Sequence, residues 1–559
     1  MRAKAELASA PEAIALKPAL LVADAVARTA ARYGARYAFG IPGNDVLETV
    51  RACEDAGIRF YLAKSEPSAA FMADAVYQLT GAPAVLIPVL GPGIANAISG
   101  IAGAMQERTA MLILCGEMAT ANHGVYNHQV FDHVALARPV TKYAEPLNPR
   151  RAAQQTAKAL DIATAHPAGP VLLNVPADFN RAPSVEQEEF VPSCTAASAL
   201  SPSALAEACA LIKNAKRPLA LIGRGALAGM APQAVARLIS GLGVPFFTTY
   251  KAKGILDERV ALCMGSVGLS PVVDTESMKL VGAADLLLLI GFDPIELRDA
   301  WLDAWPQSAA VLSIDWGAAS HRIFPVGMQA VGDVPAICDQ IRDQIVSAVA
   351  PKTAWDTQAF AALKKAVAHI VRPRAPAQGI SPAALFGEVD RQSKPDWIMT
   401  VDVGSHRILA NHVIRCHKPG QLMQSNGLGC MGYAVPAANA AQLVHPARTV
   451  IALLGDGCML MTQGELALAA EHNLPIVVIV LNDASLSLIK LKQSKMGMQA
   501  RATDFKSPRF DAIAEGFGAS GVRVQSLDAF STALAEAVAG RRFTVIDAIV
   551  DPAEYWEQM

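Results

Sequence analysis

The chain has 559 residues, of which 52% are hydrophobic and 18% are charged. So large an apolar fraction excludes wholesale disorder, and at roughly 150 residues per domain the length suggests three or four domains. The formal net charge of -2 at pH 7 gives no electrostatic reason to expect a nucleic acid or an anionic membrane as a partner.

The cysteines and the N-terminus bear on the compartment. Nine cysteines are scattered along the chain, their number is odd, and no C-x-x-C pair occurs. In a chain of this length, such cysteines are typical of a reducing compartment rather than of a disulfide-stabilised scaffold. The segment from Met1 to Lys17 lacks a continuous apolar core followed by a cleavage site, so we interpret it as a loose leader and not a signal peptide. We therefore expect a cytoplasmic protein.

Short apolar runs alternate with longer alanine-rich segments along the chain. The runs are continuous rather than alternating, which indicates strands buried on both faces, as in a parallel sheet covered by helices. The repeated strand–helix order predicts doubly wound sheets. Strands are expected at 36–42, 84–90, 111–115, 171–175, 219–222, 286–290, 311–314, 398–401, 450–454, 476–481 and 545–550, and helices at 18–34, 65–79, 150–165, 202–214 and 527–539.

The segment from Gly81 to Gln106 has no charged residue and so imitates a membrane span. Pro83, Pro88 and Pro92 interrupt it before the roughly 20 residues that a spanning helix needs. We predict a buried strand, a Gly-Pro-Gly turn and a helix packed on all sides, with no membrane as a partner.

Two proline-bearing segments, at 180–202 and 371–382, divide the chain, and such segments often connect domains. The predicted fold is α/β with three domains, at 18–182, 200–346 and 378–552. Each is expected to be built on a mostly parallel sheet covered by helices.

The strongest chemical signal is Gly455-Asp456-Gly457 at the end of one apolar run, with Asn482 at the end of the next. A carboxylate, an amide oxygen and a nearby backbone carbonyl are hard ligands suited to Mg²⁺ or Ca²⁺. Glycines let backbone N–H groups approach a phosphate at the N-terminus of a following helix. A turn without a ligand is the alternative for Gly-Asp-Gly alone, and the second strand end with an oxygen ligand argues against it.

The segment from Gly455 to Asp483 (GDGCMLMTQGELALAAEHNLPIVVIVLND) resembles the diphosphate motif of thiamine-diphosphate-dependent enzymes. The resemblance runs from about residue 18 to 551, and within the superfamily this chain is most similar to acetolactate synthase and related 2-oxo acid decarboxylases and lyases. It implies an N-terminal pyrimidine-binding domain, a central α/β domain and a C-terminal domain that binds diphosphate and Mg²⁺. The other segments that carry it are YAFGIPGNDVLETV (37–50), KSEPSAAFMADAVYQLTG (64–81), HQVFDHVALARPVTKY (128–143), IGFDPIELRDAW (290–301), DVGSHRI (402–408) and SNGLGCMGYAVPAA (425–438).

The resemblance implies thiamine diphosphate and Mg²⁺ as cofactors and assigns residues to each part. Glu66 matches the glutamate that hydrogen-bonds the pyrimidine N1′, where a buried acid with a raised pKa favours the imino tautomer. Its alternative role is a helix-entry carboxylate stabilised by the helix dipole. The Gly429 carbonyl would accept the 4′-amino group, and Met431 would be the apolar wedge beneath the cofactor.

The diphosphate and metal ligands follow from the same resemblance. Asp456, Asn482 and the Ala484 backbone carbonyl would bind the cation. His406 could instead be a surface histidine at a helix start. The remaining residues expected to contact the cofactor are Gly43, Gly404, Ser405, His406, Gly455, Gly457, Cys458 and Ser485.

Gln129 stands where related enzymes have the glutamine that faces the reactive carbon of the cofactor, and an amide suits a carbonyl oxygen on which charge develops. Its alternative is a loop residue bonded to backbone. His128, Leu488 and Ile489 are expected to line the substrate pocket, although the last two would serve equally as core. Biosynthetic relatives usually have Phe in place of His128 and Trp in place of Lys492, so the acceptor substrate is left open. Lys490 and Lys492 could bind a carboxylate or be solvated helix charges.

The central domain shows little sign of a flavin site. The arginine-and-aspartate run of flavin-binding relatives is replaced by GFDPIELRD (291–299), and the glycine turn IGRGAL (222–227) is weak evidence for a dinucleotide. We therefore expect no FAD.

The resemblance thus implies an enzyme that decarboxylates a 2-oxo acid, with pyruvate the expected donor, and passes the resulting enamine to a carbonyl acceptor. A 2-oxo acid decarboxylase or carbon–carbon lyase that releases an aldehyde is one alternative, and a flavin-dependent oxidase of the pyruvate-oxidase kind is another. A non-enzymatic paralogue is opposed by the retention of Glu66, Asp456 and Asn482. The expected assembly is a homodimer or homotetramer with active sites between subunits.

Overall fold

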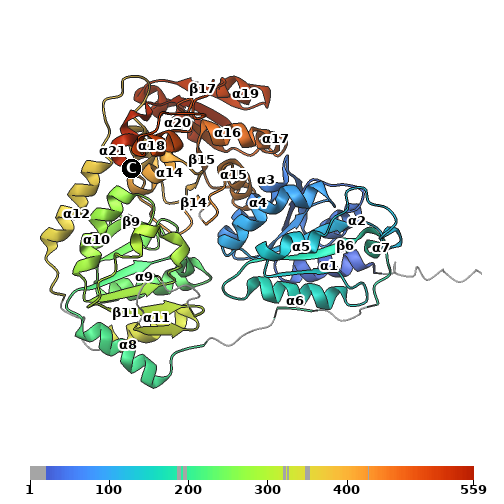
Figure 1. Cartoon of the computed structure of the whole chain (residues 1–559), viewed down its shortest axis with the longest axis horizontal. Coiled ribbons are helices and arrows are strands. Elements are labelled where there is room, and N and C mark those ends of the chain that lie inside the picture. The colour runs from blue at the N-terminus through green and yellow to red at the C-terminus, as the bar shows by residue number, and fades with distance from the viewer. Residues whose placement is uncertain are drawn as a thin grey trace, which may run out of the picture.

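The computed structural model describes residues 20–185, 190–192, 198–318, 323, 327–346, 353–425 and 427–559. Within them the chain forms three six-stranded sheets, one in each third of the sequence. In Figure 1 they lie in three bodies, coloured blue to cyan, green to yellow, and orange to red. The expected leader and part of the first expected linker, at 186–189 and 193–197, lie outside the described residues.

The N-terminal sheet has the order β2-β1-β3-β4-β6-β5, and all of its pairings are parallel. Strands β3, β4 and β6 are buried along their whole length, as their continuous apolar runs predict. The elements are β1 (Tyr37–Gly40), β2 (Arg59–Leu62), β3 (Ala84–Ile87), β4 (Met111–Glu117), β5 (Tyr143–Pro146) and β6 (Pro170–Pro176), with α1 (Val22–Arg32), α2 (Leu47–Asp55), α3 (Glu66–Thr80), α4 (Pro92–Gln106), α5 (His133–Ala137), α6 (Ala152–Thr164) and α7 (Ala177–Asn180).

The central sheet is also parallel but has the order β12-β11-β10-β7-β8-β9. Helix α12 starts beyond residue 346, the predicted end of this domain, yet its Phe360 and Leu363 belong to the core of the central sheet. The elements are β7 (Pro218–Ile222), β8 (Phe246–Thr249), β9 (Cys263–Val267), β10 (Leu286–Ile290), β11 (Ala310–Asp315) and β12 (Met328–Val331), with α8 (Pro202–Asn214), α9 (Ala231–Leu242), α10 (Pro271–Ala283), α11 (Val334–Val346) and α12 (Thr357–Ile370).

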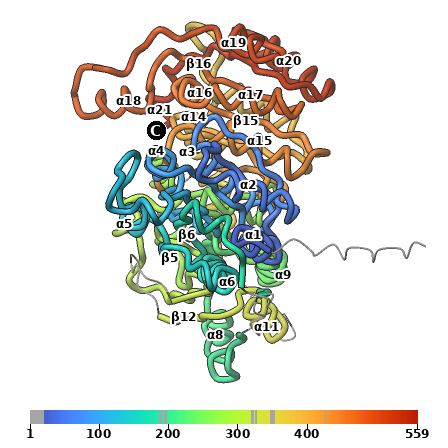
Figure 2. The backbone as a smooth tube through the Cα atoms, turned by 90° about the vertical axis from the view of Figure 1, so that its right-hand side faces the viewer, coloured from blue at the N-terminus to red at the C-terminus, as the bar shows by residue number. Residues whose placement is uncertain are grey.

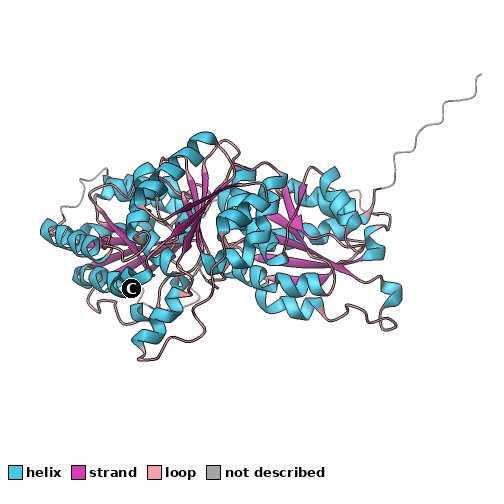
Figure 3. Cartoon of the chain, turned by 90° about the horizontal axis from the view of Figure 1, so that it is seen from above, coloured by secondary structure: helices cyan, strands magenta, loops and turns pink. Residues whose placement is uncertain are grey.

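The C-terminal sheet, β14-β13-β15-β16-β18-β17, is parallel throughout. Across the molecule, Figure 3 shows helices on both sides of the strands. The elements are β13 (Ile398–Val401), β14 (Leu422–Gln424), β15 (Val450–Gly455), β16 (Val477–Asn482), β17 (Ser520–Val524) and β18 (Thr544–Ile549), with α13 (Pro382–Gln392), α14 (Ser405–Val413), α15 (Ala434–Val444), α16 (Asp456–Thr462), α17 (Leu466–Glu471), α18 (Ser487–Lys495), α19 (Phe510–Gly516), α20 (Leu527–Gly540) and α21 (Tyr555–Gln558).

The predicted architecture of three α/β domains on parallel sheets is confirmed. Every strand and helix expected from the sequence is present, with ends that differ by at most four residues. Strands β2, β5, β8, β9, β12, β14 and β17 were not expected, because they are short and several, such as β2, β5, β12 and β17, are half-exposed edge strands.

The helix after the Gly-Pro-Gly turn differs from its prediction. Helix α4 was expected to be packed on all sides, but Ala95, Asn96 and Ser99 are exposed. Its other face packs against α3, where a Cβ at Gly100 would come within 2.5 Å of Ala70 Cβ. Helix α4 therefore lacks charged residues even though one of its edges is exposed in the single chain.

The N-terminal and C-terminal domains pack against each other through α3 and α15, which Figure 2 shows at the boundary between the blue and orange parts of the tube. The Phe71 and Tyr433 rings meet edge to face at 5.8 Å, and Lys64 pairs with Glu471 at 2.9 Å. The Glu465 carboxylate, between α16 and α17, accepts the Lys64 backbone N–H at 2.9 Å. The N-terminus of α3 is therefore fixed by residues of the C-terminal domain.

All three domains meet at a buried ion pair. Lys251 follows β8, and its Nζ lies 2.6 Å from the carboxylate of Glu107 at the end of α4, with both side chains at most 3% exposed. Lys251 also donates to the backbone carbonyl of Gln424 at the end of β14. Glu107 in turn accepts the Gly427 N–H at 3.1 Å. This junction connects the central domain to both of the others.

None of the described helices combines the length and the apolar character needed to cross a membrane.

Candidate functional site

The carboxyl ends of three adjacent strands converge at one edge of the C-terminal sheet. Strands β13, β15 and β16 are neighbours, and they lead into the segments that begin at Asp402, Gly455 and Asn482. Ligands of open parallel sheets bind outside such strand ends. The predicted diphosphate and metal residues are therefore brought together by the strand order.

Asp456 opens α16 and is 2% exposed. Its carboxylate accepts the Gly457 N–H at 2.7 Å and the Ala484 N–H at 2.6 Å. Burial, together with the neighbouring Asp483 carboxylate, raises the pKa of Asp456 to about 7. A bound cation would stabilise the ionised form, because opposite charge favours the carboxylate. The buried Asp456 carboxylate is therefore placed where a bound cation would stabilise its ionised form.

Asn482 ends β16, and its orientation is set by a buried acid. The Asn482 amide nitrogen donates to Asp547 Oδ1 at 2.7 Å. Asp547 is fully buried in β18 and also lies 3.1 Å from Arg523. Because the nitrogen is engaged, the Asn482 carbonyl oxygen is the end of the amide left for another ligand. Such second partners fix the geometry of metal ligands.

Ala484 lies in the tight turn after β16. Its φ of 56° is in the left-handed region, which a non-glycine residue adopts only where the surroundings impose it. The hydrogen bond from its N–H to Asp456 is one such constraint, and its carbonyl accepts the Phe505 N–H at 3.1 Å. Within the described ranges no three His, Cys, Asp or Glu side chains form a metal-binding group, so a cation here would depend on amide, carbonyl and external oxygens as well as on Asp456.

Two polar side-chain atoms at the N-terminus of α14 are buried without a hydrogen-bond partner. Ser405 Oγ and His406 Nε2 form no hydrogen bond in the described structure, although buried polar groups normally do. Burial and the nearby Arg407 lower the pKa of His406 to about 3, so the imidazole is neutral. An anionic oxygen group at this helix N-terminus would accept the Ser405 hydroxyl, and it would accept His406 Nε2–H when that nitrogen carries the proton. The residues present therefore fit a diphosphate.

The glycines around His406 leave room for its ring. A Cβ at Gly404 would lie 2.6 Å from His406 Cε1, and one at Gly455 would lie 3.3 Å from the same atom. Gly404 also has a φ of 143°. The imidazole therefore spans the ends of β13 and β15, and the surface-histidine alternative is wrong because His406 is buried.

The apolar and sulfur side chains predicted to contact the cofactor lie next to the Gly-Asp-Gly turn. A Cβ at Gly457 would come within 3.3 Å of Met431 Cε and 2.9 Å of Leu486 Cδ2. Cys458 Sγ donates to the Val403 carbonyl at 3.4 Å, and burial raises its pKa well above the usual value. Cys458 is thus an inert packing residue that joins α16 to the end of β13.

The other residues of this group occupy different positions. Gly429 has a φ of 66°, which glycine adopts without strain. Ser485 Oγ donates to Asp504 at 2.8 Å and so holds the turn after β16. Gly43 belongs to the N-terminal domain, where a Cβ would come within 2.6 Å of Val89 and 2.9 Å of Asp45. Gly43 is therefore apart from the C-terminal cluster of its own chain.

The predicted substrate-pocket residues on α18 divide into core and surface. Leu488 packs against the core of the C-terminal sheet, whereas Ile489 is 45% exposed. Lys490 pairs with Asp504 at 2.9 Å, and Lys492 is exposed. Only Ile489 and Lys492 of these four present their side chains largely to solvent.

The residues predicted to act on the pyrimidine and the substrate lie in the N-terminal domain. Glu66 is the first residue of α3, is only partly buried in the single chain, and accepts a hydrogen bond from the Asn96 amide at 3.3 Å. His128 and Gln129 are exposed in the loop before α5. Over the described part of this chain, no hydrogen bond or ion pair joins these three residues to the C-terminal cluster.

Sequence reasoning missed two buried acids that organise the site. Asp402 accepts the N–H groups of Gly432 and Ala434 at 3.0 Å and so positions the turn after Met431. Asp547 orients Asn482. A signal existed for both, because each is a carboxylate at or within a continuous apolar run and must have hydrogen-bond partners there.

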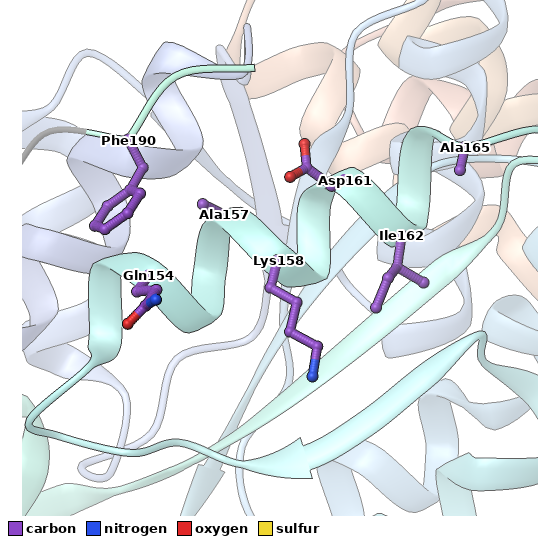
Figure 4. A pocket seen from close by; sticks show the side chains of 7 residues that line it. All are labelled: Gln154, Ala157, Lys158, Asp161, Ile162, Ala165 and Phe190. Carbon is purple, nitrogen blue, oxygen red and sulfur yellow. The ribbon is translucent and has the colours of Figure 1, made fainter. Parts of the chain in front are cut away.

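The described surface also has a cavity of about 480 Å³ that is unrelated to these strand ends. Figure 4 shows Gln154, Lys158 and Asp161 on one helix, α6, with Phe190 facing it. Asp161 accepts a hydrogen bond from Tyr33 at 2.9 Å. None of the predicted cofactor residues lines this cavity.

The sequence matches the thiamine pyrophosphate enzyme family in three regions, namely the N-terminal TPP binding domain at 21–136, the central domain at 205–341 and the C-terminal TPP binding domain at 402–548. The chain belongs to the thiamine pyrophosphate enzyme family. Each region falls within the part of the chain that forms one of the three sheets, although the N-terminal match ends before β5 and the C-terminal match starts after β13.

Similar proteins come from several bacteria. Acetolactate synthase of Bacillus subtilis (strain 168) is 31% identical over 93% of this chain and 91% of its own length. The large subunit of acetolactate synthase isozyme 3 of Escherichia coli (strain K12) is 27% identical over 95% of each chain. A protein of Pseudomonas aeruginosa named "Probable 2-ketoarginine decarboxylase" is 28% identical over 91% of this chain and 90% of its own length.

Proposed function

We propose that the protein is a thiamine-diphosphate- and Mg²⁺-dependent enzyme that decarboxylates a 2-oxo acid, with pyruvate as the donor, and joins the remaining fragment to a carbonyl acceptor. The observation that carries the proposal is the arrangement at the ends of β13, β15 and β16. Ser405 Oγ and His406 Nε2 there have no hydrogen-bond partner, and the His406 ring lies against Gly455, next to Asp456. The acetolactate synthases among the relatives support the reaction.

The C-terminal residues would hold the cofactor by its diphosphate. Asp456, the Asn482 amide oxygen and the Ala484 carbonyl would bind Mg²⁺, a cation that prefers oxygen ligands and commonly bridges to phosphate. Ser405 and His406 would bind the phosphate oxygens. When bound, thiamine diphosphate supplies the nucleophilic carbon and the electron sink for decarboxylation.

The N-terminal residues would act on the other end of the cofactor and on the substrate. Glu66 would exchange a proton with the pyrimidine N1′, and Gln129 would donate its amide hydrogen to the substrate carbonyl oxygen as negative charge develops there. His128 and Ile489 would limit the space for the acceptor.

The exposure of Gln129 and the incomplete burial of Glu66 support an active site shared between two copies of the chain. The Gln129 loop also exposes apolar side chains, including Val125 at 87% and Tyr126 at 56%, and such clusters are typical of interfaces. The uncharged exposed edge of α4 fits the same surface. We infer a homodimer or homotetramer, which sedimentation tests, and a fully active monomer would contradict it.

The reaction is tested by analysing the products formed from pyruvate alone and from pyruvate with an added aldehyde. Carboligation products in either mixture support the proposal. Acetaldehyde as the only product would identify instead a decarboxylase, the alternative favoured by the 2-ketoarginine decarboxylase relative.

We propose further that the central domain holds no FAD. Its strand order is that of dinucleotide-binding doubly wound sheets, but its glycine turn packs on its own chain. The Gly225 N–H donates to the Gly291 carbonyl at 2.7 Å, and a Cβ at Gly223 would come within 2.5 Å of that carbonyl oxygen. Flavin absorbance near 450 nm in the purified protein would overturn this expectation.

The remaining expectations concern partners and compartment. The eight cysteines that lie in described residues are unpaired, which supports a reducing cytoplasm. The near-neutral net charge supports small molecules, and neither nucleic acid nor membrane, as partners.

A further inference from the structure

The loop that carries Gln129 is anchored by a buried histidine that the assigned chemistry does not use. His133 is the first residue of α5, four positions after Gln129, and its side chain is fully buried. The Phe131 ring, between them in sequence, packs edge to face on the His133 ring at 4.7 Å. A buried polar ring in an otherwise exposed loop needs hydrogen-bond partners, and His133 has them on both sides.

One side of the ring holds the backbone on which Gln129 lies. The Gly91 N–H donates to His133 Nε2 at 3.1 Å. A Cβ at Gly91 would come 2.7 Å from the Gln129 carbonyl oxygen and 2.8 Å from Gln129 Cβ. Gln129 therefore lies directly against Gly91, at the start of α4, and His133 fixes Gly91.

Gln129 itself is held in a strained conformation. Its φ is 58°, in the left-handed region that non-glycine residues rarely adopt and that costs about 1–3 kcal/mol unless the surroundings impose it. Loss of the surrounding contacts would let this residue relax and would turn its side chain away.

The other side of the ring meets a buried carboxylate. His133 Nδ1 lies 3.3 Å from Glu117 Oε2 and 3.2 Å from Asn174 Oδ1. Because the Gly91 N–H can only donate, Nε2 must carry the lone pair and Nδ1 the proton, so Nδ1 donates toward these oxygens. Glu117 also accepts the Asn174 amide at 2.6 Å.

The carboxylate end of this chain of hydrogen bonds is ionised. Burial alone would raise the pKa of Glu117, but the hydrogen bonds from His133 and Asn174 outweigh it and lower the pKa to about 2. Glu117 ends β4 and Asn174 lies in β6, so both belong to rigid strands of the sheet. The anchor thus runs from the sheet through His133 to Gly91.

We propose that His133 and Glu117 are positioning residues that hold the Gln129 segment in its strained conformation and so orient the Gln129 amide toward the substrate carbonyl oxygen. This inference rests on the role proposed above for Gln129. It predicts that the pair acts on the steps that involve substrate and not on activation of the cofactor, which depends on Glu66.

The test uses the holoenzyme with His133→Phe and His133→Gln. Phenylalanine keeps the ring but removes both hydrogen bonds, whereas glutamine retains an acceptor and a donor. We expect kcat/KM for the 2-oxo acid to fall by about 10- to 100-fold in the phenylalanine variant, the size of effect that a displacement of about 1 Å produces, and to be partly restored in the glutamine variant. Hydrogen–deuterium exchange at C2 of the bound cofactor should stay within twofold of wild type in both.

A double-mutant cycle distinguishes positioning from a general structural role. If His133 acts through Gln129, His133→Phe should cause no further loss in a Gln129→Ala background. An equal loss in both backgrounds would overturn the proposal. Amide exchange of residues 125–131, measured on the same proteins, should be faster in His133→Phe, and unchanged exchange would also overturn it.

Glu117→Gln keeps the test decisive if His133→Phe does not fold. Glutamine fills the same space but removes the carboxylate that His133 faces, so the same loss of kcat/KM with unchanged C2 exchange is expected. Wild-type kcat/KM in this variant would contradict the anchor. Wild-type kcat/KM in Gln129→Ala would instead contradict the role of Gln129 in the proposed function.

Discussion

The N-terminal and C-terminal domains share one strand order but present different chemistry at the same place in the sheet. Numbered within each domain, both sheets have the order 2-1-3-4-6-5. In both, the fourth strand ends in a polar residue, Glu117 in β4 and Asn482 in β16. In both, a second polar residue on the sixth strand, Asn174 or Asp547, stands opposite the residue two positions before that strand end.

The acid and the amide occupy opposite strands in the two domains: the acid is on the fourth strand of the N-terminal sheet and on the sixth strand of the C-terminal sheet. In the N-terminal domain the Asn174 amide donates to Glu117 at 2.6 Å, and in the C-terminal domain the Asn482 amide donates to Asp547 at 2.7 Å. The strand end therefore presents a carboxylate in one domain and a neutral amide oxygen in the other. The same strand register therefore serves two purposes. Where the fourth strand carries the acid, its carboxylate binds a histidine, and where the sixth strand carries the acid, the amide on the fourth strand is free to bind a cation.

The largest effect is expected from removing the oxygen ligands that only the C-terminal domain provides. Asp456→Ala and Asn482→Ala should each abolish Mg²⁺-dependent binding of thiamine diphosphate, because both supply oxygens to a cation whose other ligands are phosphate oxygens. Calorimetric titration of the cofactor with Mg²⁺ measures this. Asp528→Ala, at an exposed aspartate of α20, is the matched control, and wild-type affinity in either site variant would refute the assignment.

Glu66→Gln separates the chemical role of the N-terminal domain from the binding role of the C-terminal domain. Glutamine cannot transfer a proton to N1′, so C2 exchange of the bound cofactor should slow by about 10²–10⁴, while cofactor affinity stays within a few-fold. Glu54→Gln, at an exposed glutamate of α2, should leave both unchanged. If C2 exchange in Glu66→Gln matches wild type, Glu66 is only a helix-start carboxylate.

The exchanged pair itself is tested by Asp547→Asn. An amide in place of Asp547 loses the carboxylate that orients Asn482, so Mg²⁺ affinity should fall by about 10- to 100-fold, the usual cost of losing such a second partner. Asn174→Asp, the corresponding change in the N-terminal domain, should leave Mg²⁺ affinity within twofold. An equal loss of Mg²⁺ affinity in the two variants would show that the pair of Asn482 and Asp547 has no special role in binding the cation.

The smallest effect concerns Glu465, which joins the two domains. Burial raises the pKa of Glu465 from 4.5 to about 7, so the folded protein favours the protonated acid. Its stabilising contribution is therefore complete below the unfolded pKa and is lost as the pH rises through about 7. The Tm of Glu465→Gln relative to that of wild type should therefore rise between pH 5 and pH 8, by about 2 to 4 °C for each kcal/mol of stability that wild type loses. A Tm difference that is constant with pH would contradict this.

The features that could be predicted from the sequence are those that a short local pattern is enough to indicate. Buried parallel strands show as continuous apolar runs, and the Gly-Asp-Gly turn with Asn482 shows as two adjacent strand ends, so the three sheets and the C-terminal cluster were expected. Short edge strands such as β2 and β17 lack that signal, since half-exposed strands alternate or carry charge.

What could not be predicted depends on contacts between distant strands or chains. The uncharged segment of α4 could not reveal that one edge stays exposed, because composition does not say whether a second chain covers it. The pairing of Asn482 with Asp547 requires the register of β16 against β18, which the sequence alone does not give. The anchoring of Gln129 by His133 likewise depends on the tertiary position of Gly91.

The buried pair of Lys251 and Glu107 has a consequence for how the three domains move. When the junction is closed, each charge has its partner. When it is fully open, water hydrates both. A partial opening leaves two charges neither paired nor hydrated, and an unpaired buried charge costs several kcal/mol. Because of this cost, the buried pair disfavours small displacements of the three domains relative to one another.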